Sequence, residues 1–127
     1  MAKKAKEPTS SVIGKKGEQL ALRFLKRQGY RIVKTNYQTR RGEIDIIARK
    51  NNFLVFIEVK TRIGDNLGFP EESVGYFKRK SLAFAASYFL TKEKVKEERY
   101  RTDLVSIILD SKMDPVDIRL YQNIDNE

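Results

Sequence analysis

The sequence predicts an α/β domain with a central mixed β-sheet flanked by helices. Apolar residues recur at three- and four-residue spacing near the N-terminus and again past the middle of the chain, which is typical of helices. Between and after these segments lie short runs rich in Ile, Val and Phe, which are typical of strands. The expected order is helix, three strands, helix and two strands, and 127 residues suit one hydrophobic core.

The N-terminal residues 1–11 are expected to form a disordered basic tail, because they offer almost nothing to bury. Residues 12–127 are expected to form a single domain. Its first helix is predicted over residues 14–28, and Gly29 is well placed to end it in a left-handed turn. The spacing that predicts this helix is carried by Gly17, Leu20, Ala21, Phe24, Leu25 and Gln28.

Three strands are predicted next, over residues 30–37, 43–50 and 53–62. A polar, basic loop separates the first two strands. Asn51-Asn52 separates the second and third, and Asn tolerates the positive φ angles that a tight hairpin needs.

The second half of the chain is expected to add a loop, a long helix and two strands. The loop, over residues 63–72, contains Gly64, Gly68 and Pro70. The helix follows over residues 73–92. A buried strand is predicted over residues 102–109 and an edge strand over residues 116–124.

The residue types that are missing restrict the chemistry. The chain has no Cys and no His, which excludes disulfides, thiol nucleophiles, Cys/His zinc sites and imidazole bases. Any metal must therefore be bound through oxygen, which favours Mg²⁺ or Mn²⁺. Acid–base chemistry would rely on carboxylates, Lys or Tyr.

The net charge of +9 is concentrated in the first third of the chain. Residues 1–41 contain 12 Lys or Arg against Glu7 and Glu18, whereas residues 42–127 contain 14 Lys or Arg against 15 acidic residues. A basic region of this kind attracts polyanions, of which nucleic acid is the commonest. The alternative is a solubilising tail.

No segment of the sequence is expected to enter a membrane. The longest apolar run, residues 82–90, is too short to span a bilayer, and the basic start is not followed by an apolar stretch. We therefore expect a soluble, cytoplasmic protein.

The hairpin around Asn51-Asn52 carries the strongest functional signal. If the turn has two residues, paired residue numbers sum to 103, which places Asp45 opposite Glu58 and Glu43 opposite Lys60. Like charges opposed in this way should destabilise a hairpin, whereas a divalent cation needs converging oxygen ligands. Ile47, Leu54 and Phe56 are expected on the same face. A one-residue slip would separate the two carboxylates, so this hypothesis depends on the register.

Lys60 would complete a hydrolytic site. Its ammonium group could hold an attacking water or stabilise negative charge that gathers on a phosphate. The competing interpretation is a solvated strand face with ordinary cross-strand charge pairs.

These residues resemble a known group. Residues 42–45, Gly-Glu-Ile-Asp, followed by residues 56–62, Phe-Ile-Glu-Val-Lys-Thr-Arg, resemble the PD-(D/E)xK nuclease superfamily, which includes restriction endonucleases and Holliday-junction resolvases. More narrowly, the chain resembles the bacterial YraN family of predicted endonucleases, also called UPF0102, over about residues 14–108. The further matching pieces are Gly17-Glu18, Ala21, Phe24-Leu25, Gly29-Tyr30, Asn36, Gly68, Pro70, Lys78, Arg101 and Asp103.

The resemblance implies a restriction-endonuclease-like fold and a set of site residues. Asp45 and Glu58 would bind the metal together with the backbone carbonyl of Val59, and Lys60 would be the catalytic lysine. Glu18 would assist the metal directly or through water. One departure from the superfamily pattern is that Ile44, and not Pro, precedes Asp45.

Several charged residues have two interpretations on the sequence alone. A salt bridge with Lys60 explains Glu43 as well as catalysis does, and Asp103 is either a partner of Arg101 or a group that supports the site. The remaining candidates would contact the nucleic-acid backbone or be plain surface charges: Lys15, Lys16, Arg40, Arg41 and Lys78.

The sequence therefore predicts a Mg²⁺- or Mn²⁺-dependent endonuclease that acts on DNA, with branched or damaged DNA as candidate substrates. A homodimer would suit cleavage of both strands. The alternative is a non-catalytic nucleic-acid binding protein that retains the nuclease fold. A weaker third interpretation is a protein-interaction module whose basic tail binds an acidic partner.

Overall fold

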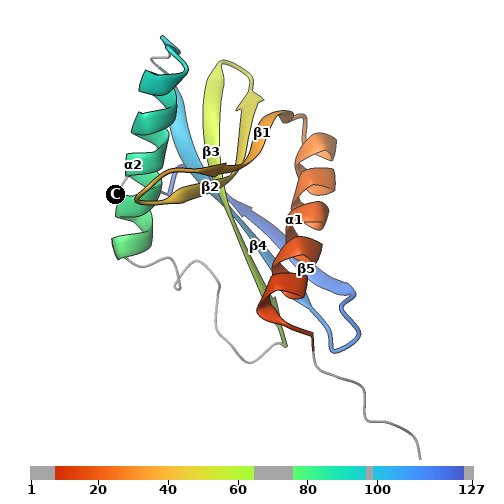
Figure 1. Cartoon of the computed structure of the whole chain (residues 1–127). Coiled ribbons are helices and arrows are strands. Elements are labelled where there is room, and N and C mark those ends of the chain that lie inside the picture. Colours follow the sequence, from red (N-terminus) through yellow and green to blue (C-terminus); the bar gives the residue numbers. More distant parts are fainter. Residues whose placement is uncertain (1–7, 65–75, 97–98, 125–127) are drawn as a thin grey trace, which may run out of the picture.

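The computed structural model describes residues 8–64, 76–96 and 99–124, with the side chains of residues 76–78 excepted. It confirms the α/β class: a five-stranded mixed sheet has helix α1 (Ser10–Arg27) on one face and helix α2 (Tyr76–Lys92) on the other (Figure 1). This architecture is compatible with the restriction-endonuclease-like fold.

The strands follow one another across the sheet in sequence order. They are β1 (Arg31–Gln38), β2 (Glu43–Lys50), β3 (Phe53–Ile63), β4 (Tyr100–Leu109) and β5 (Pro115–Tyr121). Neighbouring strands are antiparallel except β3 and β4, which are parallel. A parallel pair needs a crossover connection, and α2 lies in the segment that joins these two strands.

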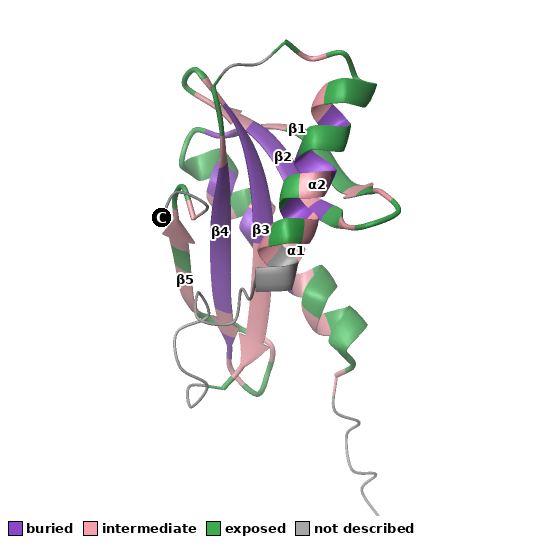
Figure 2. Cartoon of the chain, turned by 90° about the vertical axis from the view of Figure 1, so that its left-hand side faces the viewer, coloured by how far each residue is buried: buried purple, intermediate pink, exposed green. Residues whose placement is uncertain are grey.

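Each helix covers its own hydrophobic cluster. The α1 cluster holds Ala21 and Leu25 of the helix against buried sheet residues that include Ile46, Val55 and Ile57. The α2 cluster holds Leu82, Ala85, Ala86 and Phe89 against sheet residues on the opposite face. Figure 2 shows that β3 and β4 are buried for much of their length, whereas β5 at the sheet edge is not.

Helix α1 begins at Ser10, four residues earlier than the spacing predicts. Thr9 caps it, because the Thr9 hydroxyl accepts a hydrogen bond from the Val12 N–H at 3.2 Å. The helix ends as predicted: Gly29 has φ +89, and the N–H of Tyr30 donates to the carbonyl of Leu25.

The β2–β3 hairpin has the predicted register. Lys50 pairs with Phe53 and Ile46 pairs with Ile57, so the residue numbers sum to 103 throughout. Asn51 has φ +53 in the turn, a conformation that Asn adopts more readily than most residues. Ile47, Leu54 and Phe56 share one face, as expected, and pack in the α2 cluster.

Beyond this hairpin, β2 and β3 separate. The β2–β3 ladder stops at Ile46 and Ile57, yet β2 continues to Glu43 beside β1, and β3 continues to Ile63 beside β4. We call this point of separation the fork. Burial changes at the same place, because residues 54–58 are buried and residues 59–63 are only half-buried.

The other predicted strands are found with small shifts at their ends, and β4 begins two residues earlier than expected. The predicted tail extended over residues 1–11, but residues 10–11 belong to α1. Residues 1–7 of that tail, residues 65–72 of the predicted loop and the start of the second helix lie outside the described residues. Within the described part of the chain, neither helix has the length and apolar character needed to cross a membrane.

Candidate metal centre at the fork

Asp45 lies on β2 at the fork, one residue past the last pair with β3. Its carboxylate accepts a hydrogen bond from the backbone N–H of Val59 at 2.8 Å, through Oδ2. The side chain thus takes the place that a backbone carbonyl of β2 would fill in a continuing ladder. The second oxygen, Oδ1, is the one that could bind a cation.

The backbone of Val59 presents a further oxygen to the same place. In a strand, the N–H and C=O of one residue point to the same neighbouring strand. Because the N–H of Val59 meets Asp45, its carbonyl is directed into the fork as well, where the β2–β3 ladder has ended. The resemblance implied this carbonyl as a third ligand, and that assignment stays a prediction.

A pocket of about 330 Å³ lies at the fork, and we call it the fork pocket. Three acidic residues line it, Glu18 from α1 and Glu43 and Asp45 from β2. Lys15 is the one basic residue among its described lining. The other lining residues are Ser11, Gly14, Asn36 and Val59.

Close packing of α1 on β3 brings Glu18 to this pocket. A Cβ on Gly17 would lie 1.7 Å from the hydroxyl of Thr61, so only glycine allows the helix to approach so near. Asn36 then donates a hydrogen bond to Glu18 at 2.8 Å. Asn36 has φ +53 although it lies within β1, so a special backbone conformation turns this side chain to the pocket.

The pKa of Glu18 shows the electrostatic character of the pocket. Burial raises it most, and the negative charges of Asp45 and Glu43 raise it further, while the hydrogen bond from Asn36 opposes these effects. Glu18 is therefore repelled by the two other carboxylates, and a divalent cation would relieve that repulsion.

The structure does not bring every predicted residue into this pocket. Ile44 packs in the α2 cluster and Ile46 in the α1 cluster, although residues two apart in a regular strand share a face. β2 is therefore irregular at Asp45. The prediction that Asp45 shares a face with Glu58 rested on regular alternation, and this irregularity removes its basis.

Glu58 and Lys60 lie on β3 at the fork but point to the other side. Phe56 packs in the α2 cluster and Ile57 in the α1 cluster, so alternation directs Glu58 and Lys60 to the α2 face. Glu58 is only 5% exposed, and both residues are absent from the described lining of the fork pocket.

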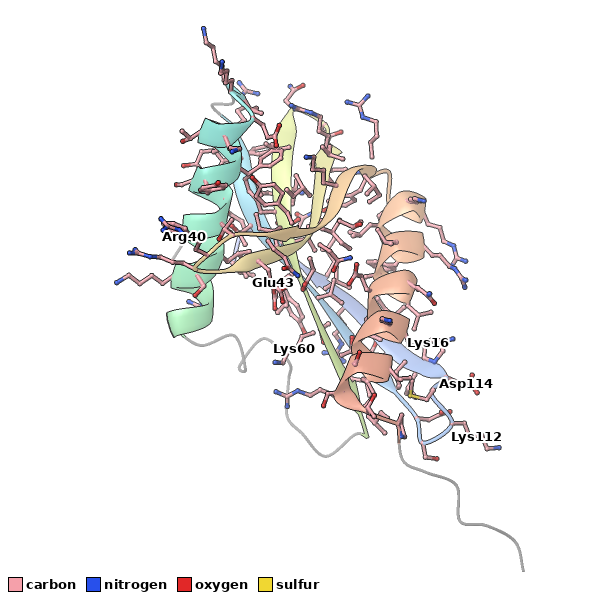
Figure 3. All side chains as sticks on the ribbon, viewed as in Figure 1. Lys16, Arg40, Glu43, Lys60, Lys112 and Asp114 are labelled. Carbon is pink, nitrogen blue, oxygen red and sulfur yellow. The ribbon has the colours of Figure 1, made fainter. Side chains whose placement is uncertain are left out.

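Glu43 connects the two sides of the fork. It lines the fork pocket and also a second pocket of about 310 Å³ beside α2, whose lining includes Thr39, Gly42 and Ser81. Figure 3 shows Glu43 on the β1–β2 hairpin and Lys60 on β3 below it. Although both residues are described, they form no ion pair there, so the salt-bridge interpretation of Glu43 is not supported.

The predicted backbone-binding residues fall in different places. Lys15 lines the fork pocket, and Lys16 follows it on α1. Arg41 lies over the ring of Phe84 on α2 at 5.2 Å, whereas Arg40 extends to the solvent in the same loop (Figure 3). The side chain of Lys78 lies outside the described residues.

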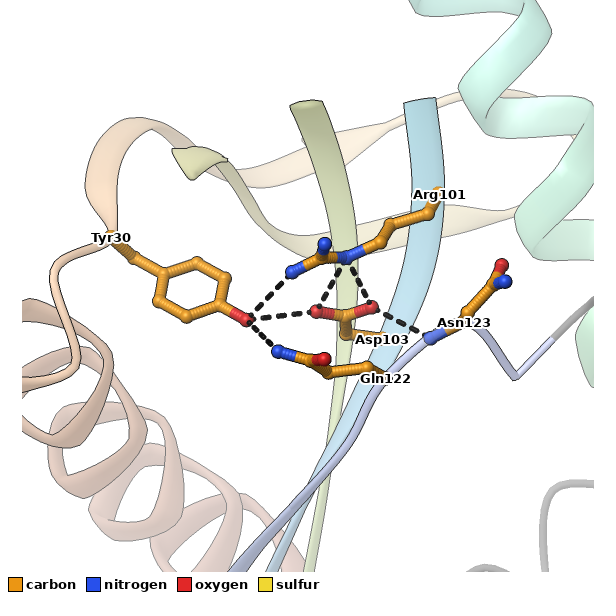
Figure 4. A network of polar contacts seen from close by, with 5 residues as sticks. All are labelled: Tyr30, Arg101, Asp103, Gln122 and Asn123. Atoms are coloured by element: carbon orange, nitrogen blue, oxygen red, sulfur yellow. Dashed lines mark hydrogen bonds and ion pairs between the residues drawn. The ribbon is translucent and has the colours of Figure 1, made fainter. Parts of the chain in front are cut away.

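Asp103 belongs to a separate polar network under the α1 face. It is fully buried and accepts hydrogen bonds from the Tyr30 hydroxyl at 3.0 Å, the Arg101 guanidinium and the backbone of Asn123 (Figure 4). Arg101 and Gln122 also donate to the Tyr30 oxygen. Asp103 is thus a structural partner of Arg101, which was one of its two interpretations.

The donors at the fork are oxygen atoms, the ligand type that suits Mg²⁺, Ca²⁺ and Mn²⁺. Within residues 8–64, 76–96 and 99–124, no three acidic side chains are close enough to form a complete metal site. Mg²⁺ usually binds through one or two carboxylates, water and substrate phosphates. Asp45 with the Val59 carbonyl provides two protein donors of this kind, and Glu18 and Glu43 stand nearby.

Residues 17–107 match a family model described as "Uncharacterised protein family UPF0102". The match contains the fork residues as well as Glu18 and Asp103. The chain belongs to the UPF0102 family. The family assignment made from the sequence motifs is therefore confirmed.

Relatives within UPF0102 cover most of the chain. A UPF0102 protein of Caldicellulosiruptor saccharolyticus is 40% identical over 111 residues, which is 87% of this chain and 94% of that protein. Another from Chloroherpeton thalassium is 45% identical over 80% of this chain and 79% of its own length. A third, from Thermodesulfovibrio yellowstonii, is 46% identical over 75% and 84%.

Sequence reasoning included Asn36 in the family pattern without assigning it a role in this UPF0102 chain. The structure places it in the lining of the fork pocket, where it donates a hydrogen bond to Glu18. A signal was present, because Asn is depleted in strands and stands here among β-forming residues.

Proposed function

We propose that this protein is a Mg²⁺- or Mn²⁺-dependent endonuclease that hydrolyses phosphodiester bonds in DNA. The observation that carries the proposal is the fork, where Asp45 is bonded to the backbone of the Glu58-Val59-Lys60 segment. The sequence resemblance to PD-(D/E)xK nucleases supports the same residues. Branched or damaged DNA is the substrate form we favour for testing first.

Each residue would contribute a defined part of the chemistry. Asp45 and the Val59 carbonyl would bind the metal, with Glu18 and Glu43 placed to complete its shell directly or through water. A bound Mg²⁺ or Mn²⁺ supplies a water of lowered pKa and polarises the phosphoryl oxygen. Lys60 would stabilise the negative charge that gathers on the phosphate.

Glu58 and Lys60 would act from the α2 side of the fork. A phosphate that entered the fork would lie between the pocket side, with Asp45, and the α2 side, with Lys60. Glu43, which lines pockets on both sides, marks this passage.

The proposal is tested by cleavage assays on matched substrates. Single-stranded, duplex, nicked and branched DNA would be incubated with the protein in Mn²⁺, in Mg²⁺ and with chelator. We expect metal-dependent cleavage that falls by on the order of a hundredfold or more in Asp45→Asn and in Lys60→Ala.

Matched controls lie at the β4–β5 turn, away from the fork. Asp114→Asn and Lys112→Ala make the same chemical changes at exposed positions (Figure 3). They should cleave like the unmodified protein. Equal residual cleavage in all four variants would trace the activity to a contaminant and overturn the proposal.

A non-catalytic nucleic-acid binding protein is the second candidate. The direction of Glu58 and Lys60, away from the fork pocket, favours it. It predicts DNA binding that weakens steeply with salt, that survives Asp45→Asn and that needs no metal.

A further inference from the structure

A strongly basic groove of about 1110 Å³ lies at the end of the β2–β3 hairpin, away from the fork. Its described lining holds four cationic side chains and two amides: Arg31, Arg49, Lys96, Arg99, Asn51 and Asn52. None of the described lining residues is acidic. None of them was a candidate in the sequence analysis either. We call it the basic groove.

Three separate segments form the basic groove. Arg31 starts β1, and Arg49 is the last but one residue of β2, just before the Asn51-Asn52 turn. The segment before β4 is tied to β3, because the Leu54 N–H donates to the Arg99 carbonyl at 2.9 Å. Convergence of basic residues from three parts of the chain distinguishes the groove from a charged run on one helix.

The end of α2 fixes the remaining wall. Lys94 adopts φ +52, and the N–H of Val95 donates to the Leu90 carbonyl, which is a Schellman ending. Val95 packs against the α2 cluster, and Lys96, the next residue, is exposed at the groove. Lys94 is neither Gly nor Asn, so its left-handed backbone conformation costs conformational free energy.

Arg31 and Arg49 are directly opposed in the β1–β2 ladder. Directly opposed residues on antiparallel strands point to one face, so the two arginine side chains extend to the same side of the sheet. The fork pocket, at the other end of the hairpin, is lined by three acidic residues.

We propose that the basic groove binds the phosphate backbone of a nucleic acid. Arginine offers paired donors that match phosphate oxygens, and the Asn51 and Asn52 amides add neutral donors. Two acidic residues, Glu97 and Glu98, follow Lys96 in the sequence and lie outside the described residues.

The edge strand β1 leads from the basic groove to the fork pocket. Arg31 lines the groove and Asn36 lines the pocket, and the strand between them is largely exposed. Five residues of strand span about 17 Å, which is about five phosphates along one strand of a DNA duplex. The groove lies toward α2 and the fork pocket toward α1, so one nucleic acid that reached both places would cross the exposed edge of β1.

The basic groove, like the proposed nuclease site, would bind nucleic acid, but binding at the groove needs neither a metal nor cleavage. Binding is therefore measured in chelator, where no cleavage occurs, by fluorescence anisotropy with a labelled 20-base-pair duplex. The groove variant is Arg31→Gln with Lys96→Gln. Its control, Arg23→Gln with Lys112→Gln, removes the same two residue types from exposed positions outside the groove.

We expect the groove variant to lose at least about tenfold in affinity, and the slope of log affinity against log salt to fall by about two. The control should change less than about twofold. Both variants should melt at the temperature of the unmodified protein, which excludes a folding defect. Equal behaviour of the two variants would overturn the proposal.

A parallel titration with labelled polyglutamate distinguishes an acidic protein partner. Loss of polyglutamate binding in the groove variant, with DNA binding unchanged, would also overturn the proposal. If groove-dependent DNA binding is found and cleavage is not, the groove stands and the proposed nuclease fails. If the protein cleaves DNA but the groove variant binds DNA as well as the unmodified protein does, the proposed nuclease stands and the groove proposal fails.

Discussion

At the scale of single residues, Asp45 combines a structural and a proposed chemical task. Its carboxylate ends the β2–β3 ladder by accepting the N–H of Val59. A hydrogen bond from a backbone N–H to a charged carboxylate is stronger than one to a neutral acceptor. Because only one carboxylate oxygen is used, the same side chain keeps a ligand atom for a cation.

Metal binding at Asp45 predicts a change in thermal stability that does not depend on catalysis. Mn²⁺ bound at the proposed site would stabilise the folded state, so millimolar Mn²⁺ should raise the Tm of the unmodified protein. The rise should be lost in Asp45→Asn and kept in Asp114→Asn. Differential scanning fluorimetry measures it, and an equal rise in both variants would remove Asp45 from the metal site.

Tyr30 and Asp103 show how a buried charge is tolerated in this protein. Asp103 is completely buried, but Tyr30, Arg101 and the backbone of Asn123 donate hydrogen bonds to it. These donors come from the residue just before β1, from β4 and from the segment after β5 (Figure 4). Breaking such a network leaves buried polar groups without partners.

Tyr30→Phe is expected to cost about 1–3 kcal/mol of unfolding free energy at pH 7, because Asp103 and Arg101 each lose a partner. Burial raises the pKa of Tyr30 above its ordinary value of 10.0. The folded state therefore keeps the phenol neutral, and its stabilising contribution is complete below pH 10 and is lost as the pH rises toward the raised pKa.

Urea denaturation at pH 7 and at pH 10.5 measures both parts of this prediction. The difference between the unmodified protein and Tyr30→Phe should shrink at the higher pH. Tyr88→Phe is the control, since Tyr88 is 41% exposed. A difference that does not change with pH would contradict the assignment to the phenol.

At the scale of elements, the fork depends on how closely α1 approaches β3. The absence of a side chain at Gly17 permits this approach, because Thr61 occupies the space where a Cβ would stand. The close approach sets the position of Glu18, the next residue, at the fork pocket. Helix packing and the candidate site are thus coupled at one turn of α1.

Gly17→Ala should destabilise the protein by about 1–3 kcal/mol, since the added methyl group overfills the space between α1 and β3. Gly14→Ala is the matched control on the same helix, where a Cβ meets nothing within 4 Å. That change should stabilise the helix by about 0.5–1 kcal/mol. Chemical denaturation compares the two, and equal effects would show that α1 tolerates displacement from β3.

At the scale of the whole molecule, the net charge and the fold would contribute to the proposed nucleic-acid binding in different ways. The excess positive charge resides in residues 1–41, which include the N-terminal residues, α1 and β1. The sheet brings Arg49 of β2 and Arg99, just before β4, into the basic groove beside Arg31. Long-range attraction and local interactions therefore involve different parts of the chain.

Removal of residues 1–7 takes away Lys3, Lys4 and Lys6 together with Glu7. We expect the Tm to stay unchanged, because α1 begins at Ser10 and its Thr9 cap is retained. The salt slope of DNA binding should fall by up to about three, because each lysine that pairs with a phosphate adds about one to that slope. An unchanged slope would assign all phosphate binding to the remaining residues.

Much of the fold could be predicted from local patterns. The period-2 and helical spacings located every element, and the Asn51-Asn52 turn determined the hairpin register. Gly29 ended α1 as its position indicated. The start of α1 was missed because Thr9 and the following serines look like tail residues until a cap forms.

The site could be predicted only in part. The motif identified Asp45 and its neighbour strand, but regular alternation failed at Asp45 because β2 turns away from β3 there. The role of Asn36 depends on a positive φ that no periodicity reveals. The direction of the Glu58 side chain became clear only from the packing of its neighbours, with Phe56 in the α2 cluster and Ile57 in the α1 cluster.

The sequence by itself determined the elements, the hairpin register, the UPF0102 family and the restriction of any metal to oxygen ligands. These depend on residue type and on spacing along a single strand or helix. The tertiary structure alone decided the fork, the pocket at Glu18, the Tyr30–Asp103 bond across 73 residues and the basic groove. Each of these depends on how separate elements pack, which cannot be predicted from residue spacing within one element.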